Sequence, residues 1–258
     1  MEKGLNKGLK LQEAKVAWIV PILGVLDKLL YTKPLLQSLA GRCGALRVFT
    51  LEYGGEQAGL GFEVERVGTL QRLYPNERLV DSGSEAYASG FSLVTPVVVP
   101  ALLKYRPELI VATEFSLLTL YAMLCRQIMK GTRLLLLVET SPRGGHRGGL
   151  GALRRGLRRF MVRGADAILT NNMAGEKYLV SDLFAPPSKI LVSPYLVSDM
   201  AALSGLGREE ILERRCSRNP GMPIRFLFVG QLLRRKGLHY ALRAFAKLLP
   251  GYLGQFRF

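Results

Sequence analysis

The stretch Ile224–Leu249, IRFLFVGQLLRRKGLHYALRAFAKLL, indicates the class of fold to which this chain belongs. Residues 224–229 are mostly apolar, as in a strand buried on both faces of a parallel sheet. From Leu238 onward, apolar residues recur at helical spacing and predict an amphipathic helix. A strand that leads through a tight turn into a helix is the repeating unit of α/β folds.

The turn between this strand and helix, residues 230–237, is bounded by glycines and carries Arg234, Arg235 and Lys236. Free backbone N–H groups at a helix N-terminus and nearby cations favour the binding of phosphate. The alternative is an ordinary connection whose three cations are solvated. Spacing alone leaves both interpretations open.

Upstream of the turn, apolar segments of strand length alternate with segments of helical periodicity. The predicted strands are residues 16–20, 46–51, 63–67, 109–112, 134–138, 167–170 and 189–192, and the predicted helices are residues 27–39, 91–104, 116–129, 150–163 and 173–183. Because parallel strands need crossover connections, this alternation predicts a Rossmann-like doubly wound parallel sheet, an α/β fold. Polar alternation in residues 63–67 suits an edge strand, and two prolines are expected to kink or divide the helix at 91–104.

The chain changes character after residue 197, where glycines and prolines surround a short charged helix. Such composition is typical of a linker between domains. We therefore expect a Rossmann-like domain at residues 1–197, a linker at 198–223 and the incomplete start of a second Rossmann-like domain at 224–258. One strand and one helix are too little for a self-sufficient core, so we expect a truncated product or a fragment.

The overall charge is strongly basic, with 36 Lys and Arg residues against 20 acidic residues and a net charge of +16. This excess favours phosphate-bearing ligands, anionic lipid surfaces or nucleic acid as partners. The chain has no apolar run long enough to span a membrane and no signal-peptide pattern, so we expect a cytoplasmic protein. Three widely spaced cysteines and the lack of a His/Asp/Glu cluster favour neither disulfides nor a metal site.

Chemically active side chains are most concentrated in the loop after residues 134–138, ETSPRGGHRGG. In open α/β sheets, ligands bind outside the carboxyl ends of the strands. Glu139 and His146 are the catalytic candidates in this loop. Alternatively, Glu139 forms an ion pair with Arg143 or Arg147, and His146 is a solvated loop residue.

The predicted helix at residues 150–163 is rich in arginine. Its basic face consists of Arg154, Arg155, Arg158, Arg159 and Arg163, and its predicted apolar stripe consists of Leu150, Leu153, Leu157, Phe160 and Met161. An arginine-rich amphipathic helix suits the interface of an anionic membrane. A helix packed on its own sheet with a solvated basic face is the alternative.

Three segments together resemble a known family, the family 4 glycosyltransferases, which are retaining enzymes of the GT-B architecture. Val229-Gly230-Gln231-Leu232, followed by Lys236-Gly237, resembles the opening of their C-terminal domain. The segment Ala165-Asp166-Ala167-Ile168 resembles an "AD-x-[IV]" strand of the family. Lys189-Ile190-Leu191-Val192-Ser193-Pro194 resembles the strand that leads toward the hinge, so the resemblance covers residues 109–249.

The resemblance implies transfer of a sugar from a nucleotide-sugar donor to a glycan or lipid-linked acceptor, with retention, in cell-surface glycan biosynthesis and without a cofactor or metal. It implies that Gly230, Gln231, Arg235 and Lys236 bind the donor phosphates. Gln231 replaces the usual arginine and brings no charge. The loop of Glu139 and His146 would orient the sugar or the acceptor, and Arg154, Arg155, Arg158 and Arg159 would face the acceptor or the inner face of the membrane.

Two other functions remain open. The family's paired-glutamate region, which holds the donor's sugar and ribose, lies beyond this stretch, so one alternative is an inactive fragment that retains acceptor or membrane binding. The other alternative is a basic nucleic-acid-binding protein, which predicts strongly salt-dependent binding. The chain contains no nucleic-acid recognition motif, which makes this function the least favoured of the three.

Overall fold

The computed structural model describes residues 10–24, 32–53, 59–68, 70–73, 91–139, 149–194, 205–207, 209–210, 212–213, 226–228 and 237–248. The chain divides into two compact units. Unit 1 consists of Met1–Gln71 and Ser92–Ser198, and unit 2 of Arg72–Phe91 and Asp199–Phe258. Most of the predicted linker at residues 198–223 lies outside the described residues, and the predicted domain boundaries stay predictions.

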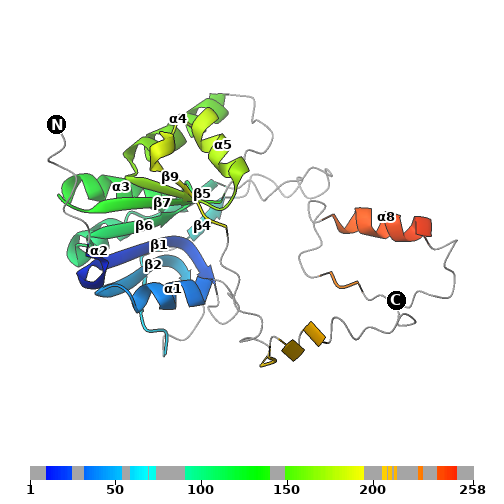
Figure 1. The fold of residues 1–258 in the computed structure, drawn as a ribbon. Helices are drawn as coiled ribbons and strands as arrows, with labels where there is room; N and C mark the ends of the chain where they lie inside the picture. Colours follow the sequence, from blue (N-terminus) through cyan, green and yellow to red (C-terminus); the bar gives the residue numbers. More distant parts are fainter. Residues whose placement is uncertain are drawn as a thin grey trace. The chain divides into compact units, whose positions relative to one another are not determined.

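Unit 1 is built on a seven-stranded sheet with the order β3-β2-β1-β6-β7-β8-β9 (Figure 1). The strands are β1 (Lys15–Gly24), β2 (Ala45–Tyr53), β3 (Glu63–Arg66), β6 (Leu109–Thr113), β7 (Arg133–Val138), β8 (Ala167–Thr170) and β9 (Ile190–Val192). Every neighbouring pair is parallel. The predicted Rossmann-like doubly wound sheet is therefore confirmed, and β3 lies at its edge as predicted.

Helices cover the two faces of this sheet unequally. They are α1 (Thr32–Ala40), α2 (Val98–Tyr105), α3 (Leu117–Ile128), α4 (Gly149–Gly164) and α5 (Met173–Ser181), with short 3-10 turns at η1 (Leu11–Glu13) and η4 (Pro187–Lys189). The core cluster on one face contains Leu36 of α1. The larger cluster on the other face contains side chains of α2, α3, α4 and α5. The alternating burial of β7 supplies Leu134, Leu136 and Val138 to this larger cluster.

The predicted helix at residues 91–104 is wrong in its first part. Phe91–Val94 is strand β5, which pairs with β4 (Leu70–Leu73) in a separate two-stranded sheet, and α2 begins only at Val98. The aromatic and β-branched residues of β5 favour an extended backbone. Pro96 then restricts the residue before it to extended conformations, which separates the strand from the helix. β4 was not predicted from the sequence.

The described part of unit 2 includes α8 (Leu238–Leu248), which confirms the predicted helix there. Residues 226–228 have no strand pairing, and Leu227 is 88% exposed, so the predicted buried strand is wrong for these residues. A strand is stabilised only by neighbouring strands. Phe226 instead packs edge to face on Phe245 of α8, with ring centroids 4.8 Å apart.

Candidate functional site

The strand order of the sheet reverses between β1 and β6. In doubly wound sheets, ligands bind outside the carboxyl ends of the strands at such a switch point. The switch-point edge, as we use the term, consists of the described residues Thr113–Thr119, from the end of β6 into α3, and Glu139, directly after β7. Thr113 ties this edge to β1, because its Oγ1 donates a 2.9 Å hydrogen bond to the carbonyl oxygen of Ile19.

Glu114 joins the ends of β6 and β7 through both its backbone and its side chain. Its backbone N–H donates to the carbonyl oxygen of Leu137 at 2.8 Å. Its carboxylate Oε1 accepts a 2.8 Å hydrogen bond from the backbone N–H of Glu139. Glu114 has φ +61°, in the left-handed region that costs about 1–2 kcal/mol for a residue with a side chain. The bonds that it makes to both strands offset this cost.

The N-terminus of α3 completes this arrangement. Ser116 caps the helix, since its Oγ accepts a 3.1 Å hydrogen bond from the backbone N–H of Thr119. The fully buried Thr119 donates from Oγ1 to the carbonyl oxygen of Glu114 at 2.7 Å. The loop between β6 and α3 is thus hydrogen-bonded both on the strand side and on the helix side. A site that must fix the position of a substrate requires such a loop.

Of the two predicted catalytic residues, the structure describes one. Glu139 is exposed at the end of β7, beside Glu114. His146 lies outside the described residues, as do Arg143 and Arg147, so the alternative ion pairs of Glu139 stay untested. The predicted catalytic roles of Glu139 and His146 stay predictions.

The predicted phosphate-binding residues Gly230, Gln231, Arg235 and Lys236 also lie outside the described residues. The described part begins again at Gly237, whose carbonyl oxygen accepts from the backbone N–H groups of Tyr240 and Ala241 at 2.9 and 3.2 Å. Gly237 has φ +74°, which strains any residue with a side chain. The glycine of the Lys-Gly pair is therefore required by the backbone at the start of α8.

The predicted division of α4 into a basic face and an opposite apolar stripe is only partly right, since Met161 and Leu157 pack in the core and Arg163 is exposed. Leu153 and Phe160, which belong to the predicted apolar stripe, are 71% and 44% exposed, so this stripe does not pack on the sheet as a whole. Arg158 and Arg159 are half-buried, and both bind α5 or the turn that follows it. Arg158 Nη1 donates to the hydroxyl of Tyr178 at 2.7 Å, and Arg159 Nε donates to the carbonyl oxygen of Asp182 at 3.1 Å.

Aromatic rings explain why these two arginines turn toward the protein. The guanidinium of Arg158 lies 5.2 Å from the ring centroid of Phe115, and that of Arg159 lies 4.3 Å from the ring centroid of Phe184. A planar guanidinium stacks on aromatic faces while its aliphatic stem covers apolar surface. Arg154 and Arg155 are exposed, as predicted.

Two kinds of group are poor candidates for nucleophiles or bases. Burial raises the pKa of the Cys43 and Cys125 thiols, which disfavours the reactive thiolate. Burial also raises the pKa of Tyr105 to about 12. The Tyr105 hydroxyl lies 3.4 Å from the carbonyl oxygen of Val16 and 3.3 Å from that of Ala45, at the amino ends of β1 and β2. It is therefore at the sheet edge opposite the switch-point edge.

The described part of the chain offers neither a metal site nor a membrane span. There, no group of three His, Cys, Asp or Glu side chains is placed to hold a metal ion. In the same residues, none of the helices combines the length and the apolar character needed to cross a membrane.

Comparison with protein families identifies the chain. Residues 30–195 match the model of the glycosyl transferase 4-like domain. The chain belongs to this family. The resemblance found in the sequence is thereby confirmed, and it extends into the first hundred residues. A comparison with curated protein sequences finds no match.

Several solved structures are similar to this glycosyl transferase 4-like protein at low sequence identity, and the first named here shares its fold. Sucrose-phosphate synthase from Thermosynechococcus elongatus is 17% identical with a TM-score of 0.54, over 92% of this chain and 60% of that one. A glycosyltransferase from Rickettsia africae is 11% identical with a TM-score of 0.48, over 82% and 51%. UDP-GlcNAc 2-epimerase from Neisseria meningitidis, bound to UDP-GlcNAc, is 14% identical with a TM-score of 0.41, over 81% and 54%. The chain thus spans only 51% to 60% of the length of these three proteins.

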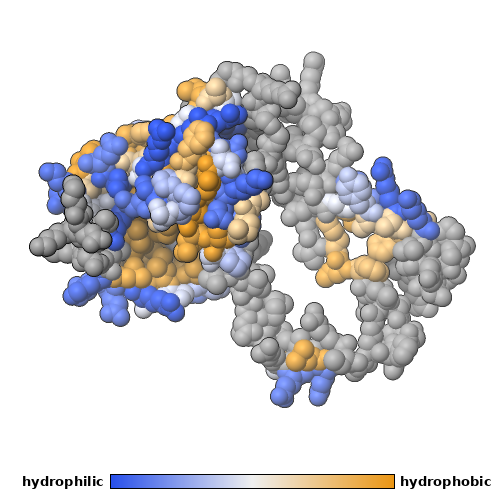
Figure 2. Space-filling model, turned by 45° about the horizontal axis from the view of Figure 1, so that its top comes forward, coloured by the Kyte–Doolittle hydropathy of each residue, from blue (hydrophilic) through white to orange (hydrophobic). Residues whose placement is uncertain are grey.

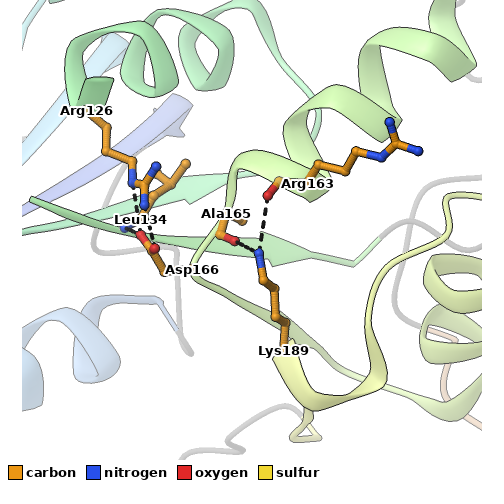
Figure 3. Close-up of polar contacts among 6 residues, drawn as sticks. All are labelled: Arg126, Leu134, Arg163, Ala165, Asp166 and Lys189. Carbon is orange, nitrogen blue, oxygen red and sulfur yellow. Dashed lines mark hydrogen bonds and ion pairs between the residues drawn. The ribbon is translucent and has the colours of Figure 1, made fainter. Parts of the chain in front are cut away.

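In this glycosyl transferase 4-like protein, two of the family segments meet in space (Figure 3). Asp166 accepts a 2.7 Å hydrogen bond from the backbone N–H of Leu134 at the start of β7, and a 3.0 Å bond from Arg126 Nε of α3. Lys189 Nζ donates to the carbonyl oxygens of Arg163 and Ala165, at 3.2 and 2.8 Å. Both segments therefore stabilise the fold, and their contacts lie at the amino ends of the strands.

The sequence analysis missed Glu114 as a residue of the site. A usable signal was present, because Glu114 lies two residues after the predicted strand at 109–112 and the loops after strands are where ligands bind. The longer loop after β7 holds more chemically active side chains and therefore gives the stronger pattern. No pattern in the sequence indicates the left-handed backbone of Glu114 or its hydrogen bond to Glu139.

Proposed function

We propose that this protein transfers a sugar from a nucleotide-sugar donor to a glycan or lipid-linked acceptor, with retention of the anomeric configuration. The observation that carries the proposal is the match of residues 30–195 to the glycosyl transferase 4-like domain. The switch-point edge supports it, because a rigid loop lies where doubly wound sheets bind their ligands.

The residues divide the work of binding between the two units. Gly230, Gln231, Arg235 and Lys236 of unit 2 bind the donor diphosphate, whose developing negative charge is stabilised by cations and backbone N–H groups without a metal or a cofactor. Glu139 of unit 1, together with His146, orients the sugar or the acceptor. Glu114 supports Glu139 through the hydrogen bond between its carboxylate and the Glu139 backbone.

In this proposal the protein works as a peripheral protein on the inner face of a membrane, in the synthesis of cell-surface glycans. The net charge of +16 supports an anionic membrane as the partner. The same charge is compatible with nucleic acid, which the family membership disfavours.

Direct binding and turnover measurements test the proposal. The purified protein is titrated by calorimetry with a panel of UDP-, GDP- and TDP-sugars, and release of nucleoside diphosphate is followed in the presence of membrane lipid extract. We expect one donor to bind and to be consumed, with the anomeric configuration retained in the NMR spectrum of the product. Binding of no nucleotide sugar, or inversion of the configuration, would contradict the proposal. The matched control is Glu139→Gln, which we expect to bind the donor and to turn it over more slowly.

A further inference from the structure

We propose that unit 1 docks on an anionic lipid bilayer through the outward side of α4. This docking face has an apolar part and a basic rim. The apolar part is Leu153, Phe160 and Phe184, and the rim is Arg159 and Arg163, while Arg154 and Arg155 are exposed nearer the start of the helix. The inference rests on the membrane location proposed above and is independent of the sugar-transfer reaction.

The orientation of α4 exposes its apolar residues. The helix is held in the core by Met161 and Val162, which are 1% and 0% exposed. Leu153 and Phe160 lie two turns apart on the other side and are 71% and 44% exposed. Gly156 lies between them, and a Cβ added there would meet no atom within 4 Å. Among the described residues, therefore, no side chain packs on the outward side of the helix at Gly156.

Phe184 extends the apolar part beyond α4. It lies after α5, is 56% exposed and has φ +57°, a backbone conformation that is unusual for a bulky residue. Arg159 lies over its ring and donates to the carbonyl oxygen of Asp182, two residues earlier. The ring is thus fixed at the surface between an arginine and the solvent, as in the interfacial zone of a membrane protein.

The charge of α4 favours an anionic bilayer over other occupants. The helix GLGALRRGLRRFMVRG contains five arginines and no carboxylate. Arginines attract lipid phosphates, and leucine and phenylalanine side chains enter the boundary between headgroups and acyl chains. On the side of unit 1 that Figure 2 turns toward the viewer, apolar surface lies directly beside strongly hydrophilic surface. A flat bilayer accepts such a mixture, whereas duplex nucleic acid offers no apolar phase for the exposed rings.

The opposite face of the sheet supplies a matched control. Leu191 of β9 is 64% exposed, close to the value for Leu153. Its neighbour Ile190 packs against the core cluster under α2–α5, so the alternation of the strand directs Leu191 to the face away from α4. Leu153→Ser and Leu191→Ser therefore remove the same side chain at similar exposure on opposite sides of the sheet.

The first test measures co-sedimentation of the full chain with phosphatidylcholine vesicles, with and without phosphatidylglycerol. We expect the wild type to bind the anionic vesicles and to dissociate at high salt. The double variant Leu153→Ser/Phe160→Ser should bind them roughly tenfold more weakly or worse, because two apolar side chains no longer enter the bilayer. Leu191→Ser should bind like the wild type. Equal binding by the double variant, or equal wild-type binding to neutral vesicles, would overturn the proposal.

A spectroscopic test avoids dependence on a destabilised variant. The sequence contains one tryptophan, Trp18, which is only 8% exposed in β1. Phe160→Trp conserves an aromatic ring, and its emission should shift to shorter wavelength when anionic vesicles are added, whereas that of Leu191→Trp should not. An unchanged Phe160→Trp spectrum would overturn the proposal. Vesicle binding without sugar transfer would contradict the transferase alone, and transfer without vesicle binding would contradict the docking face alone.

Discussion

The ammonium group of Lys189 donates a 2.8 Å hydrogen bond to the carbonyl oxygen of Ala165, so two family segments that are far apart in the sequence are in direct contact. The same ammonium donates to the carbonyl oxygen of Arg163 in the last turn of α4. A cation favours the negative end of a helix dipole. Lys189 therefore connects the start of β9 to the C-terminus of the arginine-rich helix.

Lys189→Met should destabilise unit 1. The substitution keeps the length of the side chain but removes a charged donor from two carbonyl oxygens, at a cost of about 1–3 kcal/mol. Urea unfolding followed by circular dichroism measures the change. The control is Lys177→Met on the exposed side of α5, which should unfold at nearly the wild-type urea concentration. If both variants lost the same stability, the Lys189 contacts would not be the cause.

Glu114→Ala should loosen the end of β7, because the backbone N–H of Glu139 loses its acceptor. We expect faster hydrogen exchange at the Glu139 amide and a fall in turnover of roughly tenfold or more, since a displaced catalytic group is costly. Glu114→Gln keeps an oxygen acceptor and should restore both properties. A purely structural role would instead lower the melting temperature of Glu114→Ala and leave its turnover unchanged.

Lys236→Ala should weaken binding of the nucleotide-sugar donor. Loss of one charge-assisted contact to phosphate corresponds to roughly a tenfold to hundredfold rise in Kd. Calorimetric titration measures this value, and nucleoside diphosphate alone should show the same loss because the contact is to the phosphates. Lys247→Ala removes an exposed lysine of α8 and is the matched control. Equal loss in the two variants would indicate a general charge effect.

Tyr105 should make stability depend on alkaline pH. Burial raises its pKa to about 12, above the value of about 10 for tyrosine in an unfolded chain. The folded state therefore favours the neutral phenol, and this contribution is complete below about pH 10 and is lost as the pH rises toward 12. Urea midpoints measured across this range should fall for the wild type and fall less for Tyr105→Phe. Parallel curves for the two proteins would contradict the assignment.

The strands of unit 1 could be predicted because an apolar run within its own few residues marks each strand. Residues 134–138 are continuously apolar, and such a run between helical segments indicates a strand buried on both faces. The pairing of β4 with β5 could not be predicted in this way. Its two strands are short and separated in sequence, and their pairing depends on contacts that periodicity does not record.

The orientation of α4 shows a different limit of sequence reasoning. The pattern treats every arginine as a solvated residue, but Arg158 and Arg159 lie over Phe115 and Phe184. These rings come from other elements of the fold, so only the tertiary structure identifies them as partners. Once two arginines face inward, Leu153 and Phe160 face outward. The candidate site has the same limit, because the bond between Glu114 and Glu139 joins two loops.

The interior position of β1 in the sheet has a consequence for how the chain folds during synthesis. β1 is made before both of its partners, since it pairs on one side with β2 and on the other with β6, whose residues 109–113 are made much later. Until then, one edge of β1 is unpaired and able to bind another chain. Pairing between strands that lie far apart in the sequence is slow, and this delay favours association of incomplete chains. Variants that weaken the contact between β1 and β6 should therefore first reveal themselves as aggregation during expression, before any loss of activity in the folded protein.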